Sequence, residues 1–183
     1  MESNGERKPH IEYGERHYAK FLLVKDAINP RDYSTGSVRI LCMTEKPLPP
    51  LGDEQFETRE ALEEASQRPG LFRRPLFPYY WGRTLHLSMR PFDPDVTVRR
   101  APGYVVCDMH RLRKAVPSAN RAYAERLMEE ELEAYEAWLR GECFDVEYYD
   151  SQTNELVDTE TGYYGYVETV QGSLQHLDEL DAK

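Results

Sequence analysis

The stretch 118–139, SANRAYAERLMEEELEAYEAWL, is the longest segment of this chain with a regular hydrophobic period. Its apolar side chains recur at steps of three and four residues, which is the spacing along one face of an α-helix. They are Ala124, Leu127, Met128, Leu132, Tyr135 and Leu139. The pattern predicts one long amphipathic helix whose apolar stripe is buried against a sheet.

Residues that favour helix ends flank this stretch on both sides. Pro117 cannot occupy a helix interior, Ser118 or Asn120 offers a side-chain oxygen as an N-cap, and Gly141 suits the left-handed position after a last turn. The face opposite the apolar stripe is charged and suits a solvated surface. It carries Arg126, Glu129, Glu130, Glu133 and Glu136.

Short apolar or alternating runs predict strands in the rest of the chain. They lie at 21–24, 38–43, 83–89, 103–107, 143–149 and 155–160. We expect the first two to pair through a long loop at 29–36, and the last two to form a hairpin around the turn 150–154. Shorter helices are expected at 58–65, 108–116 and 167–180, the last of them broken at Gly172.

These elements indicate an α+β fold, with an antiparallel sheet and the long helix and shorter helices packed on one face of it. At 183 residues and 21.4 kDa the chain fits a single domain, predicted over 20–180. The polar segment 1–19 is predicted to be disordered. The sequence does not decide the oligomeric state.

The three cysteines, Cys42, Cys107 and Cys143, lie in separate apolar runs without paired spacing. This pattern favours reduced, buried thiols in a cytoplasmic protein over a disulfide framework. No run approaches the ~20 apolar residues of a membrane span, and the first ten residues do not resemble a secretory signal. We therefore expect a cytoplasmic protein without a membrane partner.

A set of short turn and corner motifs is distributed over about residues 21–177. They are Asn-Pro-Arg-Asp at 29–32, Pro-Leu-Phe at 75–77, Arg-Pro-Phe at 90–92, Gly-Tyr-Val-Val at 103–106, the helix end with Tyr135, Trp138, Leu139, Gly141 and Glu142, and Gly-Tyr-Tyr-Gly at 162–165. This set resembles an uncharacterised accessory protein family encoded by bacterial phages, plasmids and integrated mobile elements. The resemblance implies a bacterial host cell and, by context, small proteins that bind and disable host defence machinery.

The chain departs from the family pattern in two places. Asp-Pro-Asp at 93–95 stands where the family often has Cys-Pro-Trp-Asp, and Thr-Glu-Thr at 159–161 stands where it often has a Cys-Trp pair. The matching motifs are structural turns and carry no chemical signature. Any role of those cysteines or tryptophans therefore does not transfer to this chain.

The sequence argues against several chemistries. It contains no phosphate-binding glycine loop, nucleophile elbow or HExxH, and its five histidines have no ligand spacing, so no cofactor and no metal are expected. A small enzyme of unknown reaction with a site near Asp95, Asp108 and His110 remains open. The favoured interpretation of Asp108 is a helix cap, and that of the neighbouring Cys107 is an inert buried thiol.

The charge of the chain is uneven along the sequence. Residues 118–183 hold 17 Asp/Glu and 4 Lys/Arg, a net of −13, whereas residues 1–117 carry +3. The leading hypothesis is a non-enzymatic accessory protein that binds a host protein or nucleoprotein complex through an acidic surface. One form of it is an inhibitor of a host defence nuclease complex, of the anti-CRISPR or anti-restriction type. The predicted partner-binding residues are Glu129, Glu130, Glu133, Glu136, Asp145, Glu147 and Asp150.

The alternative partner is nucleic acid. Arginines interleave with aromatic residues over 72–114, which is the composition of a groove for single strands. The candidate residues are Arg73, Arg74, Tyr79, Tyr80, Arg83, Arg99 and Arg100. The simpler interpretation is that the aromatic residues form core and that the arginines pair with the acidic third.

Overall fold

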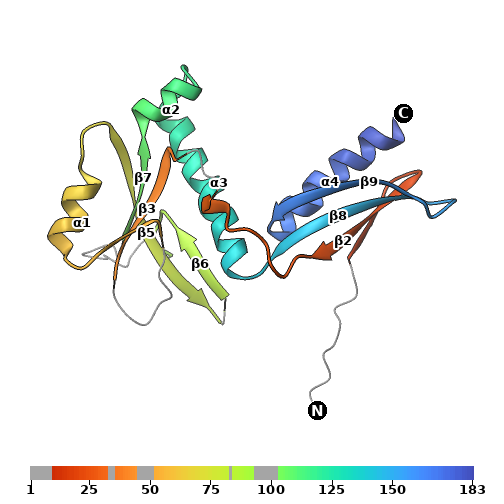
Figure 1. Cartoon of the computed structure of the whole chain (residues 1–183), viewed down its shortest axis with the longest axis horizontal. Helices are drawn as coiled ribbons and strands as arrows, with labels where there is room; N and C mark the ends of the chain where they lie inside the picture. Colours follow the sequence, from red (N-terminus) through yellow and green to blue (C-terminus); the bar gives the residue numbers. More distant parts are fainter. Residues whose placement is uncertain (1–9, 33–35, 45–51, 83, 93–102) are drawn as a thin grey trace, which may run out of the picture. The chain divides into compact units, whose positions relative to one another are not determined.

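The computed structural model describes residues 10–32, 36–44, 52–82, 84–92 and 103–183 (Figure 1). The chain divides into two compact units, each described here by itself. Unit 1 comprises residues 1–28 and 137–183, and unit 2 comprises residues 29–136. The single domain expected over 20–180 stays a prediction, because two compact units can still fold as one domain.

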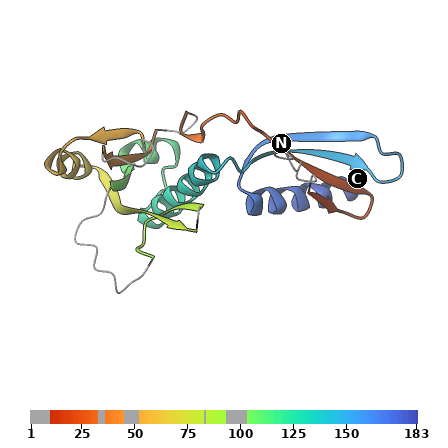
Figure 2. The same cartoon turned by 90° about the horizontal axis from the view of Figure 1, so that it is seen from below.

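Unit 1 is a four-stranded antiparallel sheet in the order β1-β2-β8-β9. Its elements are β1 (Ile11–Tyr13), β2 (His17–Leu23), β8 (Cys143–Asp150), β9 (Leu156–Tyr164) and α4 (Tyr166–Asp181). Helix α4 runs along one face of the sheet (Figure 2). The core between them contains Ala19, Phe21, Val146, Tyr148 and Leu177.

Unit 2 is built on a five-stranded sheet in the order β4-β3-β7-β5-β6, in which the β3–β4 pair is parallel and the other pairs between described strands are antiparallel. Its elements are the 3₁₀ turn η1 (Pro30–Asp32), β3 (Val38–Met43), β4 (Glu54–Phe56), α1 (Arg59–Ser66), β5 (Leu71–Trp81), β6 (Thr84–Ser88), β7 (Gly103–Asp108), α2 (Met109–Ala115) and α3 (Arg121–Leu139). The last residues of α3 belong to unit 1.

The sheet of unit 2 has a helix on each side (Figure 1). Helix α1 buries Leu62 against Leu41 and Val106, whereas α3 lies on the other face. On that face the hydroxyl of Tyr135 accepts from the backbone N–H of Gly52 at 3.5 Å. The α+β class is therefore confirmed, but there are two sheets, and the larger one has helices on both faces. The sequence pattern had predicted one sheet with the helices on one face, so this part of the prediction is wrong.

The long helix agrees closely with its prediction. Four residues of the predicted apolar stripe are buried, namely Ala124, Met128, Leu132 and Tyr135. Asn120 is the N-cap, because its side-chain oxygen accepts from the N–H of Tyr123 at 2.9 Å. Gly141 follows the last turn with φ of 69°. Local chemistry therefore sets both ends of α3.

The expected pairing of the first two strands is wrong. Strand β2 pairs with β1 and β8, whereas β3 pairs with β4 and β7. Residues 10–19, placed by the sequence in a disordered segment, include β1 and the start of β2. Strand β1 pairs with the neighbouring β2, and β2 pairs with β8, more than a hundred residues away, which a local pattern cannot show. The predicted hairpin of β8 and β9 is confirmed.

The expected break at Gly172 does not occur, since α4 is continuous. A Cβ atom at this position would lie 2.5 Å from Cε1 of Tyr163. Gly172 therefore provides the space in which the Tyr163 ring packs against the helix. None of the helices in the described part of the chain is long and apolar enough to cross a membrane.

Candidate functional site

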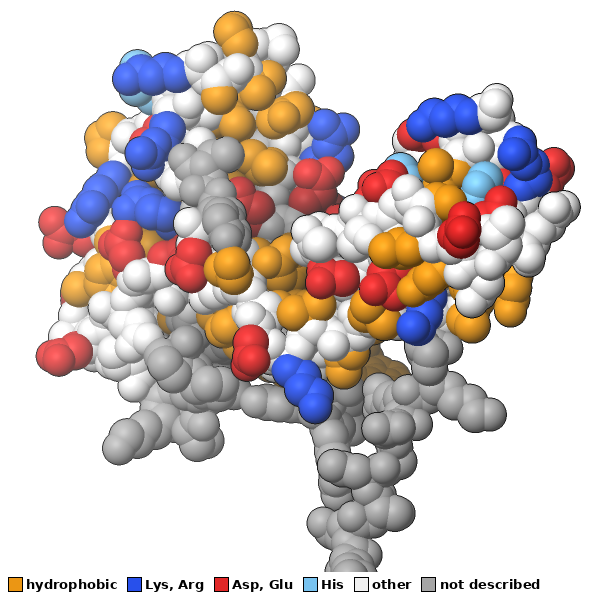
Figure 3. Space-filling model, turned by 45° about the vertical axis from the view of Figure 1, so that its right-hand side comes forward, with side chains coloured by type: hydrophobic (Ala, Val, Ile, Leu, Met, Phe, Trp, Pro, Cys, Tyr) orange, Lys and Arg blue, Asp and Glu red, His pale blue; other side chains and the backbone are white. Residues whose placement is uncertain are grey.

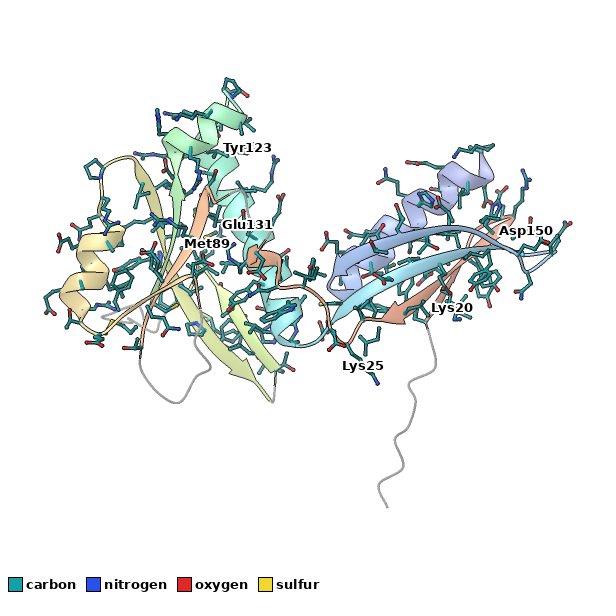
Figure 4. All side chains as sticks on the ribbon, viewed as in Figure 1. Lys20, Lys25, Met89, Tyr123, Glu131 and Asp150 are labelled. Carbon is teal, nitrogen blue, oxygen red and sulfur yellow. The ribbon has the colours of Figure 1, made fainter. Side chains whose placement is uncertain are left out.

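The predicted acidic residues are divided between the two units. Glu129, Glu130, Glu133 and Glu136 lie on α3 in unit 2, whereas Asp145, Glu147 and Asp150 lie on β8 in unit 1. Figure 4 shows Asp150 at the turn end of the β8–β9 hairpin. Each group is therefore assessed within its own unit.

Half of the glutamates on α3 bind other parts of unit 2. Glu125 pairs with Arg74 at 2.9 Å, and Glu131 pairs with Arg31. The carboxylate of Glu136 accepts from the N–H of Leu87 on the edge strand β6 and lies 3.2 Å from Nδ1 of His86. These carboxylates stabilise the fold, so they contribute little negative charge for a partner.

The exposed glutamates of α3 form a small cluster of Glu129, Glu130 and Glu133. Glu130 pairs with Arg126 at 3.5 Å in the i, i+4 arrangement. Burial, and then repulsion from Glu129, Glu136 and Glu130, raises the pKa of Glu133. The cluster is acidic but narrow.

The three predicted residues on β8 are half-buried and bonded within the hairpin. Asp145 accepts from the N–H of Gly162 at 3.1 Å, and Glu147 accepts from the hydroxyl of Tyr149 at 2.7 Å. Asp150 accepts two backbone N–H bonds of the following turn, at 2.8 Å each, and these bonds lower its pKa. These carboxylates fix the strand and its turn.

Other carboxylates of unit 1 are more exposed, and the sequence did not select them. They are Glu15, Asp26, Glu155, Asp158, Glu168, Asp178 and Glu179. Five of these lie at or after the β8–β9 turn, along β9 and α4. Figure 3 shows Asp and Glu side chains as scattered groups on the face in view. The helical period of the last segment is the sequence signal that could have placed those on α4 outside.

The net charge also divides by unit. By sequence, unit 1 holds 7 Lys/Arg and 16 Asp/Glu, a formal net of −9, whereas unit 2 holds 16 and 17, a net of −1. The acidity therefore belongs to the four-stranded sheet and α4. The long helix lies mostly in an almost neutral unit, where Glu125 and Glu131 bind arginines of other elements.

A hydrogen-bonded network lies where β9 meets α4. The hydroxyls of Tyr148 and Tyr163 donate to Glu160 at 2.5 and 2.6 Å. His176 lies 3.0 Å from Asp158 and 3.5 Å from Glu160. Burial, and then the bond to Glu160, raises the pKa of Tyr163 to about 12. The network attaches α4 to the sheet through polar groups.

Two arginines of the nucleic-acid alternative bind carboxylates within unit 2. Arg73 contacts Glu63 at 3.2 Å, and Arg74 contacts Glu125 at 2.9 Å. Tyr79 is half-buried on β5. Arg83, Arg99 and Arg100 lie outside the described residues, as does the side chain of Tyr80. Among the described residues, the most exposed rings of this segment are Trp81 and Phe92, at 65% and 62%.

The residues of the enzyme hypothesis have structural positions. Asp108 is the N-cap of α2 and accepts from the N–H groups of His110 and Arg111 at 3.0 Å. Asp95 lies outside the described residues. Cys107 is fully buried, and burial raises its pKa to about 11. Within the described ranges, no group of three His, Cys, Asp or Glu side chains is arranged to hold a metal ion.

The Asn-Pro-Arg-Asp turn holds a buried ionic cluster that the sequence did not predict. The Arg31 side chain, only 7% exposed, donates to Asp53 at 2.6 and 3.1 Å and to the carbonyl of Val38 at 2.8 Å, and it also binds Glu131. Asp53 in turn accepts from the N–H of Ile40 at 2.7 Å. Arg31 thus joins η1, β3 and α3 within unit 2.

Comparison with known proteins adds no identification. No family model matches the chain, and neither curated proteins nor solved structures give a match. The resemblance to a mobile-element accessory family therefore stays a prediction.

Proposed function

We propose that this chain is a non-enzymatic accessory protein that binds a host protein with a basic, nucleic-acid-handling surface. A component of a defence nuclease complex is the form of partner that the sequence resemblance favours. The binding surface is assigned to the exposed carboxylates of β9, its preceding turn and α4 in unit 1. The observation that carries this proposal is the net charge of −9 in unit 1.

The exposure of these carboxylates supports the assignment. Among its described residues, unit 1 has seven exposed carboxylate residues and three exposed basic residues, Arg16, Lys25 and Lys183. An excess of exposed negative charge attracts a cationic surface and accelerates its association. The same field repels nucleic acid and a second copy of unit 1, so a basic protein is the complementary partner.

The proposal is tested by reversing charges in unit 1. The triple variant Glu155→Lys, Asp178→Lys, Glu179→Lys changes three exposed positions, two of them in the last turns of α4, where lysine suits the helix dipole. Tagged full-length protein is used to capture host proteins at low salt and at about 0.5 M salt, which shortens the Debye length several-fold. We expect one specific host protein to be lost at high salt and with this variant.

The matched control is Glu129→Lys, Glu130→Lys, Glu133→Lys on α3, which makes the same change of charge in unit 2. This control should retain the captured protein. Loss of capture with the control alone would move the binding surface to α3. Capture that neither salt nor either variant affects would remove the electrostatic proposal altogether.

A further inference from the structure

The β5–β6 hairpin of unit 2 is labelled in Figure 1. It buries one face and exposes aromatic rings on the other. Leu85 and Leu87 of β6 are only 8% and 9% exposed. The alternate positions on the paired strand carry Tyr79 and Trp81, and Trp81 is 65% exposed. The solvent face of an antiparallel hairpin normally carries polar side chains. Rings at these positions therefore need another explanation than core packing.

Four rings are contiguous on this face, and we name them the ring surface: Tyr79, Trp81, His86 and Phe92. Tyr79 stacks on His86, its cross-strand neighbour, with centroids 5.2 Å apart and planes at 19°. Phe92 lies 5.2 Å from Tyr79 and 5.3 Å from Trp81, with its plane at 67° to the indole. Nδ1 of His86 lies 3.2 Å from the carboxylate of Glu136. The rings are thus ordered before any partner arrives.

Trp81 and Phe92 are 65% and 62% exposed, so no described residue covers these two rings. Helix α1 packs on Leu41 of β3 and Val106 of β7, and neither of these strands belongs to the β5–β6 hairpin. The ring surface is therefore an exposed aromatic patch on a folded hairpin. Such patches mark interaction sites on soluble domains.

An exposed arginine beside the ring surface indicates the chemistry of its partner. Of the five arginines in residues 68–92, Arg73 and Arg74 bind glutamates of unit 2, and Arg83 lies outside the described residues. Arg90, two residues before Phe92, is exposed. A partner that complements this segment presents planar rings together with negative charge. A second copy of the ring surface would place arginine against arginine.

We propose that the ring surface binds single-stranded nucleic acid, with bases stacking on Trp81 and Phe92 and Arg90 contacting a phosphate. Every base has a π-face, so stacking tolerates any sequence. A duplex conceals these faces between neighbouring base pairs, so single strands are preferred. This inference is independent of the acidic surface of unit 1. It also replaces Arg73 and Arg74 as the nucleic-acid residues, because both bind glutamates of unit 2.

The two tryptophans allow a direct test. The other tryptophan, Trp138, lies in unit 1, where its indole N–H donates to the carbonyl of Ala27 at 2.9 Å. Because the sequence contains two tryptophans, Trp138→Phe leaves Trp81 as the only indole in the chain. Titration with a dodecamer of thymidylate at low salt should quench Trp81 fluorescence, whereas a duplex of equal length should not. Fluorescence anisotropy of the labelled oligonucleotide with the wild-type chain gives the same comparison without any substitution.

Variants then separate stacking from charge. Trp81→Ala or Phe92→Ala should weaken binding about tenfold, the scale of one lost base stack. Arg90→Gln should reduce the slope of log affinity against log salt by about 0.7. Tyr13→Ala, which removes a 71% exposed tyrosine from unit 1, is the matched control and should bind like wild type.

Three results would overturn the inference. One is the absence of both quenching and an anisotropy change at low salt. Another is equal affinity for single strand and duplex. The third is binding that the ring variants leave unchanged, since phosphate contacts elsewhere would then explain it.

Discussion

Replacing Arg31 by methionine should strongly destabilise unit 2. Methionine keeps much of the side-chain length but removes four hydrogen bonds, two to Asp53 and one each to Glu131 and Val38. Asp53 and Glu131 then remain close together, with side chains only 24% and 18% exposed. Breaking a buried ion pair from one side typically costs ~3–5 kcal/mol. Because water still reaches both carboxylates, we expect about 3 kcal/mol.

The measurement is urea unfolding followed by circular dichroism, with the free energy of unfolding extrapolated to water. The control is Arg126→Met, since Arg126 pairs with Glu130 at a side-chain exposure of 66%. An exposed pair of this kind should contribute less than ~0.5 kcal/mol. The triple variant Arg31→Met, Asp53→Asn, Glu131→Gln should recover at least ~1 kcal/mol, because it also removes the uncompensated charge.

Two outcomes would refute this reasoning. If Arg31→Met costs less than ~1 kcal/mol, the cluster is solvated and weak, as surface pairs are. If the triple variant is less stable than the single variant, the lost hydrogen bonds rather than unpaired carboxylates dominate the cost.

Three further predictions follow from the packing of unit 1 and the buried thiols. Burial raises the pKa of Asp181, but hydrogen bonds from His17 and two backbone N–H groups outweigh it, so the folded pKa lies below the unfolded one. The contribution of Asp181 to stability is therefore present above its unfolded pKa and lost as pH falls through the folded pKa. Asp181→Asn should make the free energy of unfolding fall less steeply as pH is lowered into this range. All three cysteines are buried and unpaired, and burial and then Asp53 raise the pKa of Cys42 to about 12, so a thiol reagent should label the protein only after denaturation. Gly172→Ala should lower the melting temperature despite alanine's higher helix propensity, because the new Cβ meets Tyr163; in a Tyr163→Leu background the same change should stabilise the protein.

The candidate binding surfaces show where the linear charge pattern misleads. The sequence selected residues 118–183 as one acidic block, yet the boundary between the units falls within α3. Glu125, Glu131 and Glu136 of that helix bind Arg74, Arg31 and the β6 edge. Charge counted along a chain therefore overestimates charge presented to a partner. Of the exposed carboxylates in residues 118–183, three lie on α3 and five lie on β9, its preceding turn and α4.

The ring surface shows the reverse case. The hairpin segment was recognised as aromatic and basic, and the simpler interpretation placed its rings in the core. Alternation along β5 and β6 divides the side chains instead, so Leu85 is buried while Trp81 is exposed. The pleat of a strand decides which residue faces solvent, but only the position of the strand in the sheet decides which face is covered.

The sequence by itself determined what depends on neighbours within a few residues: the span of α3, the Asp108 cap of α2, the β8–β9 hairpin and the α+β class. Only the tertiary structure decided that β2 pairs across the chain with β8, that two sheets form, and that Arg31 binds Glu131 one hundred residues away. Hydrogen-bonding preferences and helical period are local and appear in any short window. Strand partners and ion pairs between distant segments depend on the energy of the whole packed arrangement, which no short window contains.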